Sequence, residues 1–171
     1  MLMEFLELAK LRFSARNYEN KEIEKEKLDK IIEVIKAAPT AKNNQPFIVY
    51  FLQSEEAIEK VDRITPCRFG ANTVLLITYK KSEEWVNRDD ENFRSGVEDA
   101  SIVATHIMLE ATDLGLATCY INRFSVAGAK AEFKLSDDEE PVLLMAIGYS
   151  SAVPSERHEL TKDTEDIVKF L

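Results

Sequence analysis

The 171-residue sequence is poor in the residues on which several kinds of site depend. Its two cysteines, Cys67 and Cys119, and its two histidines, His106 and His158, do not cluster. This argues against a disulfide scaffold and against a zinc site built from histidine and cysteine. The five glycines stand apart from one another, so the sequence contains no glycine-rich phosphate loop. If the protein binds a phosphorylated cofactor, side chains must hold much of the phosphate.

Long apolar runs and an excess of basic charge are also missing. No stretch approaches the 18 apolar residues of a membrane-spanning helix, and Glu4 and Glu7 interrupt the apolar N-terminal segment, so we expect no signal peptide. The net charge of −9 argues against nucleic acid as a partner. With 45% apolar residues, the chain can bury a real core. We therefore expect a single domain over residues 1–171, soluble and cytoplasmic.

The apolar periodicity predicts helices and strands that do not alternate regularly, which favours an α+β fold. Ser54, Ser125 and the pair Ser95 and Glu98 are expected to cap helices at their N-termini, and Gly115 is expected to close one. The segment 82–94 is charged and irregular. The expected helices are 4–11, 24–38, 54–64, 95–114, 125–133 and 164–171, and the expected strands are 47–52, 72–80, 116–121 and 141–149.

The expected helix 97–114 is apolar on more than one side. One series repeats at helical spacing from Ala100 to Leu114, and Ile102 and Leu109 add apolar surface elsewhere. Such a helix is buried either in the core or in a subunit interface.

The segment Arg12-Phe13-Ser14-Ala15-Arg16 offers the first candidate site. In extended backbone, alternate residues point to one side, so Arg12, Ser14 and Arg16 would form a cradle for a phosphate. The other interpretation is a solvated loop after a helix, whose basic residues offset the helix dipole.

Three further polar groupings accompany this segment. The loop Pro39–Pro46 carries hydroxyl and amide groups that suit a heteroaromatic edge, or else forms an ordinary turn. The segment 114–123 combines a helix end, a strand and the polar exit Asn122-Arg123, or else serves packing alone. The pair Arg157-His158 lies in the tail, where exposure to solvent is the simpler reading.

In their order and spacing, these four segments resemble the nitroreductase-like FMN-dependent oxidoreductase family over nearly the whole chain. The most specific feature is Arg-x-Ser-x-Arg followed about 25 residues later by Pro-Thr-Ala-x-Asn-x-Gln-Pro. The resemblance implies a mixed, mostly antiparallel sheet flanked by helices, with a C-terminal tail that crosses a homodimer.

The resemblance also implies roles for individual residues. Arg12, Ser14 and the tail residue Arg157 match contacts to the phosphate and ribityl chain, and Arg16 matches a basic residue near the flavin pyrimidine. The loop matched by Thr40, Ala41 and Asn43 covers the flavin from the partner subunit. The segment that passes the reactive edge of the flavin matches Tyr120, Ile121, Asn122 and Arg123. Arg68 is a further candidate without a firm match.

The function implied by the resemblance is hydride transfer from NADH or NADPH, through flavin N5, to a nitroaromatic, quinone or similar small acceptor, by ping-pong turnover. FMN would lie at the homodimer interface, and no metal would take part. Three alternatives remain open: a specialised flavin reductase such as a dehalogenase, a flavin-binding or sensing module without turnover, and an interaction domain without a cofactor.

Overall fold

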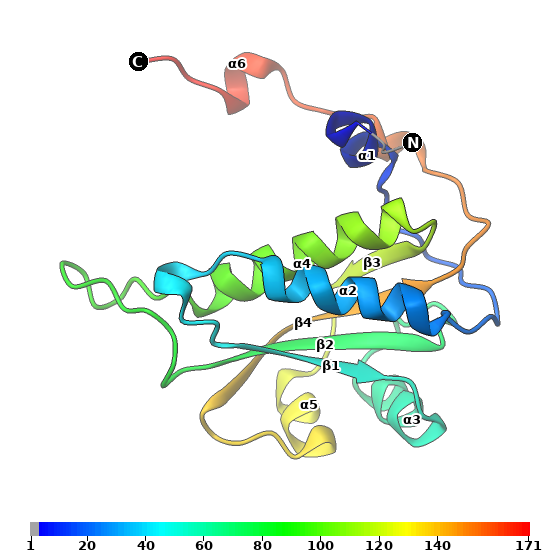
Figure 1. Ribbon diagram of the computed structural model, residues 1–171, viewed down its shortest axis with the longest axis horizontal. Coiled ribbons are helices and arrows are strands. Elements are labelled where there is room, and N and C mark those ends of the chain that lie inside the picture. The colour runs from blue at the N-terminus through cyan, green and yellow to red at the C-terminus, as the bar shows by residue number, and fades with distance from the viewer. Residues whose placement is uncertain (1–3) are drawn as a thin grey trace.

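The computed structural model describes residues 4–171, which form four strands and six α-helices (Figure 1). Two short 3₁₀ turns, η1 and η2, lie in connections. The bounds are α1 Phe5–Leu11, α2 Lys25–Ala37, η1 Ala41–Asn43, β1 Phe47–Leu52, α3 Glu55–Ile64, β2 Thr73–Lys80, α4 Gly96–Asp113, β3 Ala117–Ile121, α5 Val126–Phe133, β4 Glu139–Gly148, η2 Glu156–His158 and α6 Thr164–Ile167.

The four strands form one sheet in the order β1-β2-β4-β3, and every neighbouring pair is antiparallel. The central strand β2 contains the run Val74–Ile77, which is fully buried because both faces of the sheet are covered. At the β3 edge, Ser14 makes a parallel bridge with Thr118. The expected α+β class and the mostly antiparallel sheet are confirmed.

Helices cover both faces of the sheet. On one face, α2 and α4 pack together over a core that includes Ile31, Val103 and Ile107. On the other face, α3 and α5 pack over a second core that includes Val61 and Ala129. Figure 1 shows these layers above and below the sheet. The 18-residue helix α4 therefore has a buried face along its whole length.

Three of the four expected helix caps are present. The hydroxyl oxygens of Ser54 and Ser125 accept hydrogen bonds from backbone N–H groups three residues later. Gly115 adopts a φ of 72°, and its N–H and that of Leu116 donate to carbonyls of the last turn of α4. This is the Schellman arrangement, which requires the left-handed conformation that glycine adopts without strain.

The fourth expectation, a capping box at Ser95 and Glu98, is wrong. The Ser95 side chain makes no cap hydrogen bond to the helix. Its hydroxyl instead donates to the buried Asp99 carboxylate at 2.7 Å and accepts from the Trp85 N–H at 3.1 Å. A buried polar cluster thus takes the hydroxyl away from the helix end.

Three expected features differ in extent. Ile32 of α2 is 42% exposed, although it stands at helical spacing with Leu28 and Ile35. The last strand begins at Glu139, two residues before Pro141, because hydroxyls of Tyr50 and Thr78 donate to the buried Glu139 carboxylate. The expected helix 164–171 is a single turn, α6, whose residues are all exposed.

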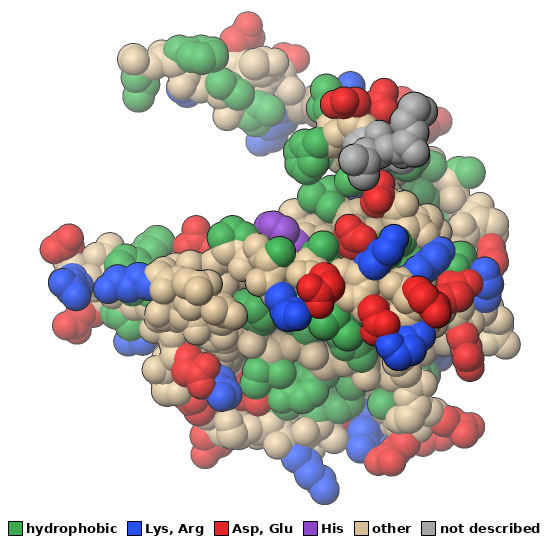
Figure 2. All heavy atoms as spheres, viewed as in Figure 1, with side chains coloured by type: hydrophobic (Ala, Val, Ile, Leu, Met, Phe, Trp, Pro, Cys, Tyr) green, Lys and Arg blue, Asp and Glu red, His purple; other side chains and the backbone are tan. Residues whose placement is uncertain are grey.

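Helix α1 and the C-terminal tail lie outside the two helical layers that cover the sheet, and α1 contacts α4 (Figure 1). Figure 2 shows hydrophobic side chains gathered on both. Phe5 is 68% exposed, and Leu160 and Phe170 are 75% and 95% exposed. No helix among residues 4–171 has the length and apolar character needed to cross a bilayer.

Candidate binding site

A pocket of about 520 Å³ lies between the segment after α1 and the C-terminal tail. It is lined by Arg12, Ser14 and Arg16 from the first segment and by Arg157 from η2. Two segments that are about 140 residues apart in the sequence thus meet at one hollow, as the phosphate-cradle interpretation requires.

The three arginines of this pocket are available to a ligand. Within residues 4–171, none of their guanidiniums makes an ion pair or a side-chain hydrogen bond. The same holds for Arg88 and Arg123, whereas Arg63, Arg68 and Arg94 are paired. Three unpaired guanidiniums around one hollow repel one another, and the chain as a whole carries −9. Such a donor set fits a phosphate, which guanidinium groups bind through paired, charge-assisted hydrogen bonds.

The first segment is fixed against the sheet by its backbone. The Ala15 N–H donates to the Thr118 carbonyl at 3.0 Å, and Ala15 itself is fully buried. Since neighbouring side chains of an extended segment point to opposite sides, burial of Ala15 leaves Ser14 and Arg16 at the pocket. The Tyr18 hydroxyl donates to the Ala146 carbonyl at 3.2 Å and closes the other end of the segment.

His158 brings the tail arginine to the pocket. Its Nε2 lies 2.9 Å from the Lys10 carbonyl oxygen, and because a carbonyl only accepts, Nε2 carries the proton. The imidazole also meets the Phe13 ring edge to face at 6.3 Å. These contacts hold η2 against the end of α1, and Arg157 precedes His158 directly.

The titratable groups behind the pocket stay neutral near neutral pH. Burial raises the pKa of the Cys119 thiol, and the positive charge of Arg16 opposes that shift. Burial likewise raises the pKa of Tyr18, again with an opposing effect from Arg16. No thiolate or phenolate therefore cancels the arginine charge.

The loop of Thr40, Ala41 and Asn43 does not reach this pocket within one chain. It lies beside the first turn of α4, where the Ala41 N–H donates to Asp99 Oδ1 at 2.8 Å. The arginine pocket lies beyond the other end of α4, next to Thr118. At a rise of 1.5 Å per residue, the stretch of α4 from Asp99 to Asp113 separates the two by about 21 Å.

The segment Tyr120–Arg123 comprises the last two residues of β3 and the two residues after it, and it leads away from Thr118. Ile121 is buried in the second core, and the Tyr120 hydroxyl lies 3.5 Å from the Ser101 carbonyl oxygen. Asn122 and Arg123 are exposed, and the Arg123 carbonyl accepts from the Thr65 hydroxyl at 2.6 Å. These four residues lie outside the lining of the arginine pocket.

Two polar residues that line the arginine pocket cannot be identified from the sequence alone. Asn17 and Ser155 face the pocket with polar side chains, and no sequence pattern singles them out as ligands. Arg68, the uncertain candidate, makes two hydrogen bonds to Asp62 and one to the Ala71 carbonyl. In the part of the chain that the structure describes, no group of three His, Cys, Asp or Glu side chains is arranged to hold a metal ion.

Known proteins share this sequence and fold. The sequence profile of the nitroreductase family matches residues 9–67 and 65–149. A crystal structure of a nitroreductase family protein from Clostridium difficile is 37% identical, with a TM-score of 0.93 and 98% of each chain covered. A Methanothermobacter thermautotrophicus protein provisionally named NADH dehydrogenase/NAD(P)H nitroreductase is 25% identical over 98% of this chain and 88% of its own. A protein from Exiguobacterium sibiricum, provisionally assigned as a nitroreductase and crystallised with FMN, shares the fold at 21% identity, with a TM-score of 0.85 and coverage of 100% and 99%.

Proposed function

The chain belongs to the nitroreductase family, and from this premise we propose that it is an FMN-dependent oxidoreductase. It uses NADH or NADPH to reduce a small acceptor, such as a nitroaromatic or a quinone. The observation that carries the proposal is the trio of unpaired arginines, with Ser14, around one pocket of an acidic protein. The FMN in the Exiguobacterium structure and the NAD(P)H in the name of the Methanothermobacter relative support the choice of cofactor and electron donor.

Bound FMN would supply the redox chemistry, taking a hydride from the nicotinamide at N5 and passing it to the acceptor in ping-pong order. The protein's part is to bind and orient. Arg12, Ser14 and Arg157 donate to the phosphate and ribityl chain, and Arg16 places a positive charge toward the pyrimidine. The contact of His158 with the Lys10 carbonyl holds the segment that carries Arg157 beside the first segment, which supports its place in the cradle.

A homodimer completes each site. The loop with Thr40, Ala41 and Asn43 lies at the far end of α4 from the chain's own cradle, so we assign it to the cofactor bound by the second subunit. The uncovered apolar side chains of α1 and the tail support this assembly, since a second subunit would bury them (Figure 2). In this proposal the tail crosses the dimer, while the single-domain organisation and the cytoplasmic location stay predictions.

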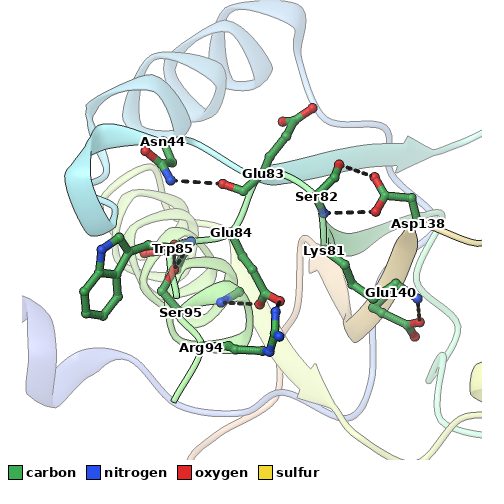
Figure 3. Close-up of polar contacts among 12 residues, drawn as sticks. Asn44, Lys81, Ser82, Glu83, Glu84, Trp85, Arg94, Ser95, Asp138 and Glu140 are labelled. Atoms are coloured by element: carbon green, nitrogen blue, oxygen red, sulfur yellow. Dashed lines mark hydrogen bonds and ion pairs between the residues drawn. The ribbon is translucent and has the colours of Figure 1, made fainter. Parts of the chain in front are cut away.

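In this proposal, the residues at the C-terminal end of β3 form the substrate side of the site. Tyr120 and Ile121 would contact the reactive edge of bound FMN, and the exposed Asn122 and Arg123 would meet the acceptor or nicotinamide. The connection between β2 and α4 is anchored rather than loose. Figure 3 shows Asn44 Nδ2 donating to the Glu83 carbonyl, at 3.1 Å. We propose that this short connection leaves the pocket open to small acceptors.

The test is an absorbance spectrum of the purified protein, repeated after adding FMN and then NADH or NADPH without oxygen. We expect a flavin band near 450 nm that bleaches with one of the nicotinamides, followed by recovery when a quinone or nitroaromatic is added. Gel filtration with light scattering is expected to give twice the mass of the 19.5-kDa chain.

Other outcomes separate the alternatives. A flavin band that neither nicotinamide bleaches would indicate a binding or sensing module. Bleaching without recovery on any nitroaromatic or quinone would point to a specialised reductase. Failure to bind added FMN would contradict the proposal altogether.

A further inference from the structure

The loop from Thr40 to Gln45 has a strained backbone. Lys42, Asn43 and Gln45 adopt φ values of 53°, 56° and 51°, the left-handed region that residues with a side chain rarely enter. Such a conformation persists only where surrounding contacts over-determine it, and it is found at functional sites more often than elsewhere. The contacts that hold this loop are therefore part of the site that the loop serves.

The loop is held by hydrogen bonds within itself and by two contacts to other parts of the chain. The Gln45 N–H donates to the Thr40 hydroxyl at 3.0 Å, which closes the loop on itself. The Asn44 side chain donates to the Glu83 carbonyl (Figure 3). Only the contact from the Ala41 N–H to Asp99, at 2.8 Å, joins the loop to a helix of the core.

The surroundings of Asp99 fix its carboxylate where it accepts from the Ala41 N–H. It is 1% exposed, and both carboxylate oxygens are used: Oδ1 by the Ala41 N–H and Oδ2 by the Ser95 hydroxyl at 2.7 Å. Ser95 accepts in turn from the Trp85 N–H (Figure 3), so the carboxylate is braced from the β2–α4 connection as well. A buried carboxylate is costly unless its partners are in place, which fixes its geometry and that of the loop.

We propose that Asp99 is a positioning residue that shapes the Thr40–Asn43 loop for the FMN bound by the other subunit. The inference rests on the proposed function, because it needs FMN and a shared site. Asp99 itself touches no cofactor. Its effect is predicted to cross the interface, since about 21 Å of α4, from Asp99 to Asp113, separates it from its own chain's cradle.

Mixed dimers test this directly. The cradle variant carries Arg12→Ala with Ser14→Ala, and the anchor variant carries Asp99→Ala. Each is given a different affinity tag, the two are co-expressed, and the mixed dimer is isolated through both tags. FMN affinity and stoichiometry are measured by quenching of FMN fluorescence, independently of turnover.

Both homodimers are expected to bind FMN about tenfold or more weakly than the parent, because each loses hydrogen bonds to a charged group. In the mixed dimer, one site joins the altered cradle to the loop of the anchor variant. The other site joins the unaltered cradle of the anchor variant to the unaltered loop of the cradle variant. We therefore expect one site of parental affinity per dimer. A purely structural defect in the anchor variant would not produce this recovery.

Two outcomes overturn the inference while leaving the proposed function intact. One is an anchor homodimer with parental affinity, and the other is a mixed dimer with no restored site, which would place the effect of Asp99 in its own chain's site. Parental affinity in the cradle variant, or a monomeric protein, would instead refute the proposed function, and the inference with it.

Two more variants distinguish the loss of the Ala41–Asp99 hydrogen bond from a folding defect caused by Asp99→Ala. Ala41→Pro removes the same hydrogen bond from the loop side, at the first position of a 3₁₀ turn after extended backbone, where proline is tolerated. It is expected to behave as the anchor variant in the mixed dimer. Asp99→Asn keeps an acceptor for the Ala41 N–H and is expected to restore most of the affinity; equal losses in Asn and Ala variants would count against the proposed role.

Discussion

Replacing Arg157 by alanine tests whether the pocket recognises a phosphate. Its guanidinium lines the pocket without an internal partner, so its removal leaves no protein group unpaired. A hydrogen bond to a charged group contributes about 1.5–3 kcal/mol, or roughly a 10- to 150-fold change in Kd. Because Arg157 is exposed, solvent screens the interaction, and we expect about a tenfold rise in the Kd for FMN.

The comparison with riboflavin isolates the phosphate term. Riboflavin has the same ring and ribityl chain without the phosphate, so Arg157→Ala is expected to leave its affinity nearly unchanged. The parent should prefer FMN to riboflavin by a factor that shrinks about tenfold in the variant. Fluorescence quenching measures all four affinities under the same conditions.

Arg63→Ala is the matched control. It makes the same change in net charge at an exposed arginine that pairs with Glu132 at 2.8 Å, outside the pocket. At physiological salt, charges more than about 8 Å from the ligand are screened, so this variant should bind FMN as the parent does. Equal Kd values for the two variants, or equal losses of FMN and riboflavin affinity in Arg157→Ala, would refute the phosphate assignment.

Three further predictions concern the pocket mouth, the core and alkaline pH. Replacing Asn122 and Arg123 by glycine should change the ranking of acceptors in steady-state assays more than it changes FMN affinity. An unchanged ranking would show that these two residues do not contact the acceptor. The Thr118 hydroxyl is the one buried side-chain polar atom among residues 4–171 without a partner, so Thr118→Val should raise the free energy of unfolding by about 1 kcal/mol in urea titrations. Burial and the hydrogen bond to Glu139 raise the pKa of Tyr50 from 10.0 to about 12. Its contribution to stability is therefore complete below pH 10 and lost toward pH 12, and the melting temperature of Tyr50→Phe should fall less over that range than that of the parent.

The sequence predicts most of the fold because its local signals agree with one another. Ser54, Ser125 and Gly115 mark helix ends that the structure confirms. The expected tail helix over 164–171 shortens to one turn because its residues are exposed, so packing does not stabilise a longer helix there. The early start of β4 at Glu139 is hidden for a different reason, since the two hydroxyls that satisfy this carboxylate come from other strands.

The binding site, too, can be predicted only in part from the sequence. The spacing of Arg12, Ser14 and Arg16 allows either a phosphate cradle or a solvated loop, and the resemblance favours the cradle. In the structure all three line one pocket. That Arg157 joins them depends on a contact between His158 and the Lys10 backbone, which spans 148 positions and leaves no local pattern. The Ser95–Asp99 pair shows how a local rule misleads: a serine before a helix suggests a cap, yet a buried carboxylate one turn later takes its hydroxyl.

In the proposed homodimer, the length of α4 explains why the cradle and the Thr40–Asn43 loop of one chain would serve different sites. The cradle at its C-terminal end brings positive charge, and the loop at its N-terminal end brings strained backbone held by a buried carboxylate. Neither half has an evident use alone, since a bare arginine cluster repels itself and a strained loop costs free energy. Pairing two chains with opposed directions of α4 would join each cradle to a loop and cover the apolar surface of α1 and the tail in the same step. On this argument, assembly and cofactor binding are coupled, and weakening the anchor of the loop in one subunit should be felt in the cofactor site of the other.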